Sequence, residues 1–254
     1  MNIVLLGSGN VATHLAIALK AIGENIVQVF SPNFDNAKQL ADKVNSEAIN
    51  QTSEIDSQAD LYIISVKDDA IVEVAAGLSK VKGLVVHTSG TTDIKVISSL
   101  VNKAGVFYPL QTFSKAKDLN FNNIPLCIEA TDSEQLELLN ELAHKLSKEV
   151  YKLDGEKRKV LHLAAVFACN FTNHLYAMAN QLLIKNDLDF DIIRPLIAET
   201  ANKVLVDLPE NVQTGPAVRN DESTMNKHLS MLSDLPELQE IYQTLSTSIK
   251  LAHK

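Results

Sequence analysis

The chain lacks tryptophan and contains only two cysteines in 254 residues. Cys127 and Cys169 each lie in an apolar run, and their spacing matches no metal-ligand motif. Two such residues cannot build a disulfide framework or a cysteine-based metal site. We therefore expect no metal site, and we expect both cysteines to be reduced and buried in the core of a cytoplasmic protein.

Long apolar runs and an excess of positive charge are also missing. No apolar stretch is long enough to cross a membrane without polar interruption. The first apolar strand begins so early that it leaves no room for a signal peptide. A net charge of −8 argues against nucleic acid or an anionic membrane surface as a partner. These absences leave a small-molecule substrate as the expected partner.

The start of the chain carries its most informative motif. Residues 3–6 form a short apolar run, typical of a strand buried on both faces of a parallel sheet. A G-x-G-x-x-A pattern follows, and apolar residues at helical spacing come next. In this pattern the glycines allow a tight turn and close approach of the backbone to a pyrophosphate, which the helix N-terminus then faces. We predict a dinucleotide site at Gly7, Ser8, Gly9, Asn10, Val11 and Ala12; the alternative is a glycine turn without a ligand.

Strands and helices alternate after this motif, up to about residue 154. Crossover helices between successive strands predict a doubly wound α/β sheet, in which ligands bind beyond the carboxyl ends of the strands. The loops after Leu6, Phe30, Val66 and His87 should therefore face one crevice. Further strands are expected at residues 25–30, 47–49, 61–66, 84–87, 105–109, 125–129 and 149–153.

From residue 155 onwards the pattern is helical only. A run over residues 156–186 is apolar around most of its circumference, which predicts a buried helix. Further helices are expected at residues 191–208, 221–233 and 236–253. The sequence thus predicts a Rossmann domain over residues 1–154 and an all-helical domain over residues 155–254.

Five segments spread along the chain carry a family resemblance: residues 7–12, 87–90, 107–113, 170–175 and 215–221. With this domain order, the chain resembles the 6-phosphogluconate-dehydrogenase-like superfamily, which includes pyrroline-5-carboxylate, ketopantoate and β-hydroxyacid reductases. More narrowly, it resembles bacterial NADP oxidoreductases that join a Rossmann-like domain to a C-terminal domain of unknown function. The resemblance implies a nicotinamide cofactor and a homodimer through the helical domain, and it names no substrate.

The end of the second expected strand lacks an acidic residue. An NAD-preferring site would place Asp or Glu there to bind the ribose hydroxyls. Here Ser31 and Asn33 follow the strand, and the first acid is Asp35. Because a carboxylate would repel a 2′-phosphate, its absence favours NADP over NAD, with Ser31, Asn33 and Lys38 as donors. No arginine follows, and the alternative is that Ser31 and Asn33 are only turn residues.

The loops after the next two strands supply candidates for the reacting end of the cofactor. Val66 and Lys67 are expected to flank the nicotinamide, with Lys67 either a catalytic acid or a solvated surface lysine. His87 ends the following strand, and a histidine can donate a proton when a hydride reduces a carbonyl or imine. Ser89 can bind the substrate oxygen. The alternative is a strand-end histidine followed by a Ser-Gly turn.

The long helical run lacks the lysine that the similar reductases carry on the matching helix. At about 100° per residue, His162, Asn170, Asn173 and His174 fall on one polar stripe. We take Asn170 and His174 as the substrate-facing pair, with a satisfied core network as the alternative. Arg219, one of only three arginines, is the candidate for binding a substrate carboxylate. An ion pair of Arg219 with a neighbouring acid is equally compatible with the sequence.

These features predict an NADP-dependent oxidoreductase that transfers a hydride to or from a small carbonyl or imine. The alternative is a nucleotide-binding regulatory or scaffold protein that has lost catalysis, which the missing lysine supports. Hydride transfer between bound cofactor and small oxo acids or imines would separate the two.

Overall fold

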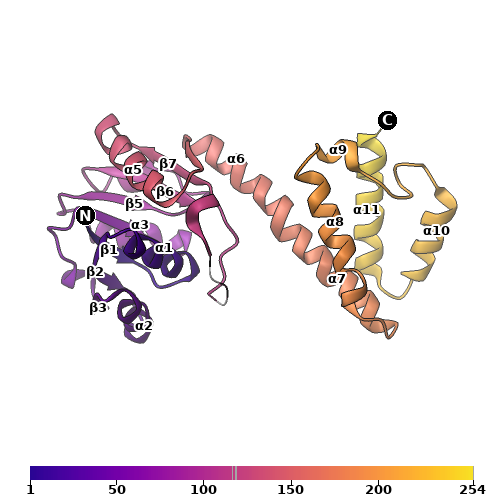
Figure 1. The fold of residues 1–254 in the computed structure, drawn as a ribbon, viewed down its shortest axis with the longest axis horizontal. Coiled ribbons are helices and arrows are strands. Elements are labelled where there is room, and N and C mark those ends of the chain that lie inside the picture. Colours follow the sequence, from indigo (N-terminus) through magenta and orange to yellow (C-terminus); the bar gives the residue numbers. More distant parts are fainter. Residues whose placement is uncertain (116, 118, 254) are drawn as a thin grey trace. The chain divides into compact units, whose positions relative to one another are not determined.

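The computed structural model describes residues 1–115, 117 and 119–253, and it divides into two compact units, Met1–Cys169 and Asn170–Lys254 (Figure 1). The first unit is built on one eight-stranded sheet with the order β3-β2-β1-β4-β5-β6-β7-β8. Its strands are β1 (Asn2–Leu6), β2 (Asn25–Phe30), β3 (Glu47–Ile49), β4 (Leu61–Ile64), β5 (Leu84–His87), β6 (Ala104–Pro109), β7 (Leu126–Ala130) and β8 (Val150–Lys152).

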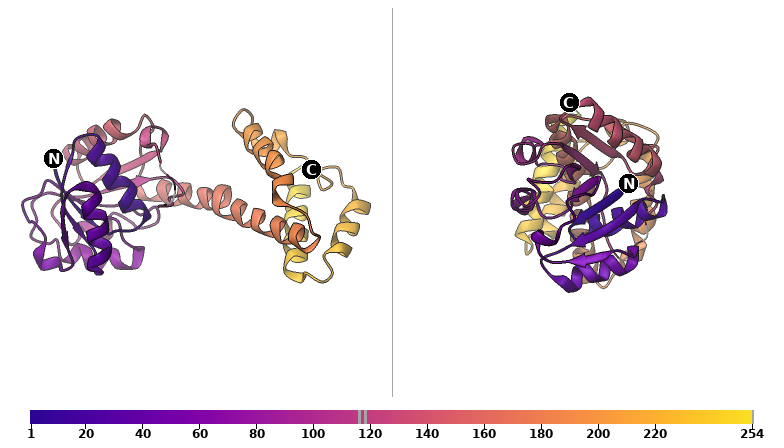
Figure 2. Two further views of the ribbon diagram at one scale, coloured as in Figure 1. Left: turned by 60° about the horizontal axis from the view of Figure 1, so that its bottom comes forward. Right: turned by 90° about the vertical axis from the view of Figure 1, so that its left-hand side faces the viewer.

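Helices cover both faces of this sheet, because its central strands are apolar in both directions. In β1, Ile3 and Leu5 pack into one core cluster with α1, α2 and α5, whereas Val4 and Leu6 pack into a second cluster with α3 and α4. This arrangement, which can be followed for the N-terminal strands and helices in Figure 2, confirms the predicted doubly wound α/β fold. The helices are α1 (Asn10–Ala21), α2 (Phe34–Val44), α3 (Ile71–Ala76), α4 (Lys95–Ser98) and α5 (Ser133–Leu146), with short 3-10 turns η1 (Thr52–Glu54) and η2 (Asp68–Ala70).

Strand β7 runs antiparallel to β6, while the other pairs among the described strands are parallel. A parallel return would need a crossover helix, and the described part of the connection from β6 to β7 holds only the 3-10 turn η3 (Phe121–Asn123). Helix α5 then provides the crossover that makes β8 parallel to β7. The loops that end β1, β4 and β5 consequently lie along one edge of the sheet.

Helical structure alone follows from Gly155, where α6 (Gly155–Ala165) begins. The expected domain boundary coincides with this start, whereas the two compact units divide between residues 169 and 170. The second unit contains η5 (Phe190–Ile192), α8 (Arg194–Val204), α9 (Pro209–Val212), α10 (Glu222–Met231) and α11 (Pro236–Ala252). No helix in the described part of the chain combines the length and apolarity that crossing a membrane requires.

The long helical run is not one uniform α-helix. A π-helical segment, η4 (Val166–Phe171), separates α6 from α7 (Thr172–Lys185). A π-bulge adds a residue to a turn, so side chains on either side of it are out of phase by about 100° relative to a regular helix. The predicted polar stripe from His162 to His174 assumed a constant 100° per residue and is wrong on this point.

The helical segments are also far more exposed than predicted. Among the described residues, α7, α8, α9 and α11 contain no buried side chain. The expectation of a buried helix therefore fails for the single chain. Cys127 is buried as predicted, whereas Cys169, which lies in η4, is exposed and its assignment to the core was wrong.

Candidate cofactor and active site

The glycine loop between β1 and α1 has the geometry that a phosphate site requires. Gly7 adopts φ +130°, and a Cβ atom there would lie 2.0 Å from the backbone oxygen of Ser65, so only glycine fits. Gly9 is the N-cap of α1, and a Cβ atom on it would meet nothing within 4 Å. No side chain in the described chain caps α1, so its first N–H groups are free to bind a phosphate. The residues present fit the pyrophosphate of a dinucleotide.

A segment after β6 lies across this loop and was not recognised from the sequence. The Asn10 amide donates to the Phe113 carbonyl at 3.0 Å, and His14 Nε2 lies 2.8 Å from the Ser114 carbonyl. Lys115 Nζ donates to the Ser8 carbonyl at 2.8 Å. The segment thus brings a cation to the phosphate loop from more than 100 residues along the chain, a distance that motif reading does not span.

The residues predicted to bind the 2′-phosphate lie where β2 passes into α2. Ser31 is buried, and its N–H donates to the Ile49 carbonyl at 3.2 Å. Asn33 caps α2, accepting the N–H of Asn36 through its side chain at 3.2 Å. Lys38 is exposed and forms an ion pair with Asp42 at 3.1 Å. The loop from Ser31 to Asn33 is therefore uncharged, and the exposed Asp35 follows it in the first turn of α2. The assignment of Ser31, Asn33 and Lys38 to the phosphate stays a prediction.

Hydrogen bonds tie the loops after β4 and β5 together. The Thr88 hydroxyl donates to Ser65 Oγ at 3.2 Å, and the Thr91 hydroxyl donates to the carboxylate of Asp68. Val66 is half-buried beside this contact, whereas the side chain of Lys67 is exposed at the start of η2. Val66 and Lys67, the predicted neighbours of the nicotinamide, thus lie on a loop that is hydrogen-bonded to the loop after β5.

His87 is completely buried at the end of β5. Its Nδ1 accepts the N–H of Ser89 at 3.2 Å, which places the proton of the neutral ring on Nε2. In the described chain Nε2 has no hydrogen-bond partner. Burial, followed by the nearby Arg158 guanidinium, lowers the pKa of His87 from 6.5 to about 4. His87 is therefore neutral at pH 7 and can donate a hydrogen bond, but it is not charged with a second proton.

Ser89 is also buried, and its hydroxyl already holds the loop. Its Oγ accepts the N–H groups of Thr91 at 3.1 Å and Thr92 at 3.0 Å. Arg158, fully buried in α6, anchors the same loop by donating to the Thr92 carbonyl at 2.6 Å and pairing with Glu129. The loop after β5 is therefore rigid, which suits a site that must hold a small substrate.

A tyrosine and a histidine that were not predicted as catalytic residues lie against this loop. Tyr108 Oη and His162 Nδ1 are 3.0 Å apart. A Cβ atom on Gly90 would lie 2.7 Å from His162 Nδ1 and 2.8 Å from Tyr108 Cζ, so the glycine is required for this contact. Two signals were present in the sequence: Tyr108 lies in the segment 107–113 that carries the family resemblance, and His162 lies on the predicted polar stripe.

The remaining predicted site residues belong to the second unit. Asn170 and His174 are exposed, with Asn170 inside the π-helical segment. Arg219 is exposed in the turn before α10. Asp221 caps α10 through Thr224 and Glu222 pairs with Lys250, so within the described residues neither forms an ion pair with Arg219. That Asn170 and His174 face His87 across one cleft stays a prediction.

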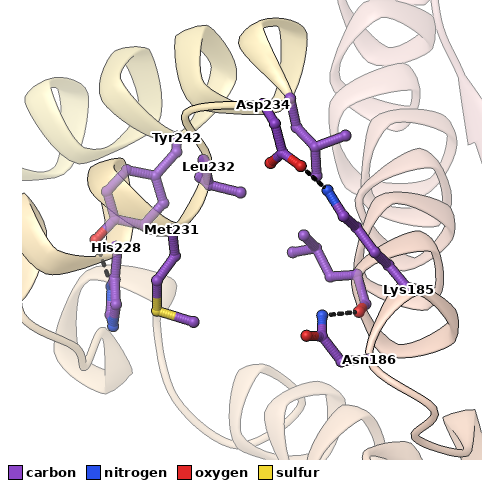
Figure 3. A pocket seen from close by; sticks show the side chains of 9 residues that line it. Lys185, Asn186, His228, Met231, Leu232, Asp234 and Tyr242 are labelled. Carbon is purple, nitrogen blue, oxygen red and sulfur yellow. Dashed lines mark hydrogen bonds and ion pairs between the residues drawn. The ribbon is translucent and has the colours of Figure 1, made fainter.

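The second unit also has a pocket of about 490 Å³ (Figure 3). Its polar groups satisfy one another: Lys185 pairs with Asp234, and His228 Nδ1 lies 2.8 Å from the hydroxyl of Tyr242. The rest of its wall is largely leucine and methionine. The pocket therefore presents an apolar surface and contains none of the predicted site residues.

The chain was compared with known families and structures. Residues 2–89 match a family described as NADP oxidoreductase coenzyme F420-dependent, and residues 124–249 match a domain of unknown function, DUF2520. A crystal structure of a Bacteroides fragilis protein assigned as an NADP oxidoreductase is 48% identical, with 98% of this chain and 97% of that chain covered and a TM-score of 0.93. No curated protein matches the chain.

Two more distant structures share the fold. An imine reductase from Myxococcus stipitatus, solved in complex with NADP+, is 12% identical over 99% of this chain and 94% of that chain, with a TM-score of 0.69. A 1-pyrroline-5-carboxylate reductase from Streptococcus pyogenes is also 12% identical, over 98% of each chain, with a TM-score of 0.66. At this identity the likeness shows the fold alone.

Proposed function

The chain belongs to the family of the Bacteroides fragilis NADP oxidoreductase, and we propose that it transfers a hydride between NADP and a small carbonyl or imine. The observation that carries this proposal is the open, uncapped N-terminus of α1 at Gly9, beside a Gly7 that no other residue can replace. When bound, the reduced nicotinamide supplies a hydride. The chain's own residues must bind the dinucleotide, orient the substrate and provide one proton.

The first turn of α1 and the cation of Lys115 would hold the pyrophosphate. The N–H groups at residues 10–12 and the positive end of the helix dipole favour an anion there. Lys115 Nζ, 2.8 Å from the Ser8 carbonyl, adds a positive charge at the same loop. Ser31, Asn33 and Lys38 are proposed to receive the 2′-phosphate, because the end of β2 carries no carboxylate that would repel it.

His87 is proposed to orient the substrate. Its unpartnered Nε2–H is a buried donor, and such a group gains most when a carbonyl oxygen or imine nitrogen accepts its hydrogen bond. Ser89 keeps the loop in place and Val66 and Lys67 border the nicotinamide. Asn170, His174 and Arg219 are proposed to complete the substrate site from the helical domain. The Nε2–H donor of His87 supports a substrate with a carbonyl or imine acceptor, and so does the imine reductase that shares the fold.

A homodimer through the helical domain is also proposed. Large apolar side chains are exposed in the single chain, among them Leu196 of α8 at 65%, and Leu205 at 80% and Val206 at 87% in the turn after α8. Exposed apolar surface on this scale marks an interaction site. A second copy of the chain, offering the same apolar helices, would cover it.

One substitution tests the cofactor site. Gly9→Asp places a negative charge where the pyrophosphate approaches, and we expect NADPH binding, followed by the fluorescence of the reduced nicotinamide, to be lost. Circular dichroism should remain unchanged, because the Cβ position at Gly9 is open. Asn25→Asp adds the same charge at the opposite end of β2 and should bind NADPH normally.

Three outcomes would count against the proposal. Undiminished NADPH binding by Gly9→Asp would remove the phosphate loop from the site. Tighter binding of NADH than of NADPH by the unaltered chain would reverse the cofactor preference. Binding of NADPH without oxidation in the presence of small oxo acids and cyclic imines would instead favour a regulatory nucleotide-binding protein.

A further inference from the structure

Tyr108 and His162 form a hydrogen-bonded pair at the carboxyl edge of the sheet. In the register of β5 and β6, Val106 is the partner of His87, so Tyr108 lies two residues beyond the end of β5. This places it level with the Ser89–Gly90 turn, while on its other side it is still paired with Cys127 of β7. Its hydroxyl is 3.0 Å from Nδ1 of His162, which reaches it from α6. The pair therefore stands beside the loop that carries His87.

The backbone of the loop packs closely against this pair at Gly90. Any side chain at residue 90 would have to displace His162 Nδ1, at 2.7 Å, and the Tyr108 ring, at 2.8 Å. This close packing against Gly90 restricts the rotation of the Tyr108 and His162 side chains, and it buries little apolar surface in return. The hydrogen bond between Tyr108 and His162 and the need for glycine at residue 90 both indicate that the two rings are held in a fixed position.

The proposed reaction needs a proton source, and His87 does not supply it. Reduction adds a hydride, taken from the reduced nicotinamide dinucleotide, to the carbon of a C=O or C=N bond, and adds a proton to its oxygen or nitrogen. His87 is neutral and fully buried, so giving up its single ring proton would leave an imidazolate, which is not an option near pH 7. Another group has to provide the proton.

We propose that Tyr108 donates this proton to the acceptor oxygen or nitrogen and that His162 returns one to Tyr108. The inference rests on the proposed oxidoreductase function. In the forward step the Oη–H bond of Tyr108 breaks as the new O–H or N–H bond of the product forms. The Nδ1–H of His162 passes to the phenolate oxygen as Nε2 of the half-exposed ring takes a proton from water, so no imidazolate forms. Exchange of the ring proton with water then returns it from Nε2 to Nδ1 and restores the starting tautomer. One hydride and one proton are consumed in total, and the enzyme is regenerated.

The surroundings of Tyr108 keep its proton in place until it is needed. Burial, together with the nearby Cys127 and Asp68, raises the pKa of Tyr108 to about 12, while Arg158 acts in the opposite direction. The phenol is therefore protonated throughout the neutral range. The half-exposed His162 ring is the route by which the buried hydroxyl exchanges protons with water.

The first test needs no substrate. In NMR spectra of the histidine rings, replacing bound NADPH by NADP+ introduces a positive charge at the nicotinamide, and we expect the His162 signals to move. Tyr108→Phe should shift the same signals in the free protein and abolish their response to the change of cofactor. His144, exposed on α5, serves as the control and should not respond. Identical His162 signals in the NADPH and NADP+ complexes would overturn the inference.

The second test uses 2-methyl-1-pyrroline and pyruvate as imine and carbonyl probes. Tyr108→Phe should lower kcat about 100-fold or more, the usual contribution of a proton donor, and leave NADPH binding unchanged. Tyr151→Phe, an exposed tyrosine of β8, is the matched control and should keep full activity. Full activity of Tyr108→Phe would refute the assignment.

A third variant separates proton supply from simple positioning. His162→Asn keeps a hydrogen-bonding group near the place of Nδ1 but cannot relay a proton. If His162 only positions the tyrosine, His162→Asn should be active; if it relays protons, the variant should be about as slow as Tyr108→Phe. Failure of the unaltered chain to bind either cofactor would defeat the proposed function itself, whereas normal binding with an indifferent Tyr108 would defeat only this inference.

Discussion

Replacing His87 should remove a specific part of the dependence of stability on pH. Burial lowers the pKa of this imidazole to about 4, compared with 6.5 in the unfolded chain. Between pH 6.5 and pH 4 the imidazole is protonated in the unfolded chain but not in the folded chain. The free energy of unfolding therefore decreases as the pH falls through 6.5 towards 4. Above pH 6.5 the contribution is complete, and below pH 4 it is gone.

The size of the effect follows from the same two pKa values. A tenfold difference in proton affinity corresponds to about 1.4 kcal/mol, so the whole contribution is on the order of 3 kcal/mol, of which about 2 kcal/mol is lost between pH 7.5 and pH 5. This is a large fraction of the stability of an ordinary domain. His87→Asn retains an acceptor for the Ser89 N–H but does not titrate, so its unfolding free energy should fall by about 2 kcal/mol less over that range.

Urea unfolding followed by circular dichroism at both pH values measures the difference, since the chain has no tryptophan to report by fluorescence. Other groups also titrate, among them Glu24, and comparison of the two proteins cancels their contributions. The control is His144→Asn, which removes an exposed imidazole from α5 and should follow the unaltered chain. The same loss of stability in His87→Asn as in the unaltered chain would show that His87 is not held neutral by burial.

Two further predictions concern the phosphate loop and the helical surface. Lys115→Met should weaken NADPH binding about tenfold in a fluorescence titration, because it removes the cation that contacts the Ser8 carbonyl. The control Lys117→Met, two residues further along, should bind NADPH normally. Equal effects of the two variants would show that only the net charge of the chain matters. Light scattering should give twice the 27.8 kDa chain mass for the unaltered protein and the mass of one chain for Leu196→Glu. The control Asn202→Glu, on the same helix, should stay dimeric. A monomeric unaltered protein at micromolar concentration would refute the proposed dimer.

Local patterns were sufficient to predict most of the fold. Strands β2, β3 and β5 were predicted with their observed bounds. Of these three, β5 is buried at every position, as its apolar run indicates, whereas β2 and β3 also contain exposed polar residues. The tight turn after β1 was likewise predicted, since the backbone requires glycine at Gly7, whereas the Cβ position at Gly9 is open. The π-helical segment was missed, because nothing in the spacing of apolar residues distinguishes it from a regular helix.

The site was harder to predict because its chemistry depends on long-range contacts. Tyr108 and His162 are 54 residues apart, and only the folded chain brings them to one hydrogen bond. Sequence reasoning chose His87 for its ordinary pKa, which burial then moved out of the neutral range. Cys169 was assigned to the core because its neighbours are apolar, but Phe167 and Phe171 beside it are themselves exposed.

His87 and His162 of the first unit illustrate how burial sets the role that a histidine can take. His87 has no exposed surface and no counter-charge that favours its protonated form enough to offset burial, so its one useful property is a fixed N–H donor. His162 is half-exposed and bonded to a buried phenol, so it can exchange with water and pass a proton inwards. A donor that orients an acceptor must not lose its proton, and a relay must regain one at every turnover. Exposure therefore decides the role of each histidine: the buried His87 acts as a fixed hydrogen-bond donor, and the half-exposed His162 acts as the proton relay.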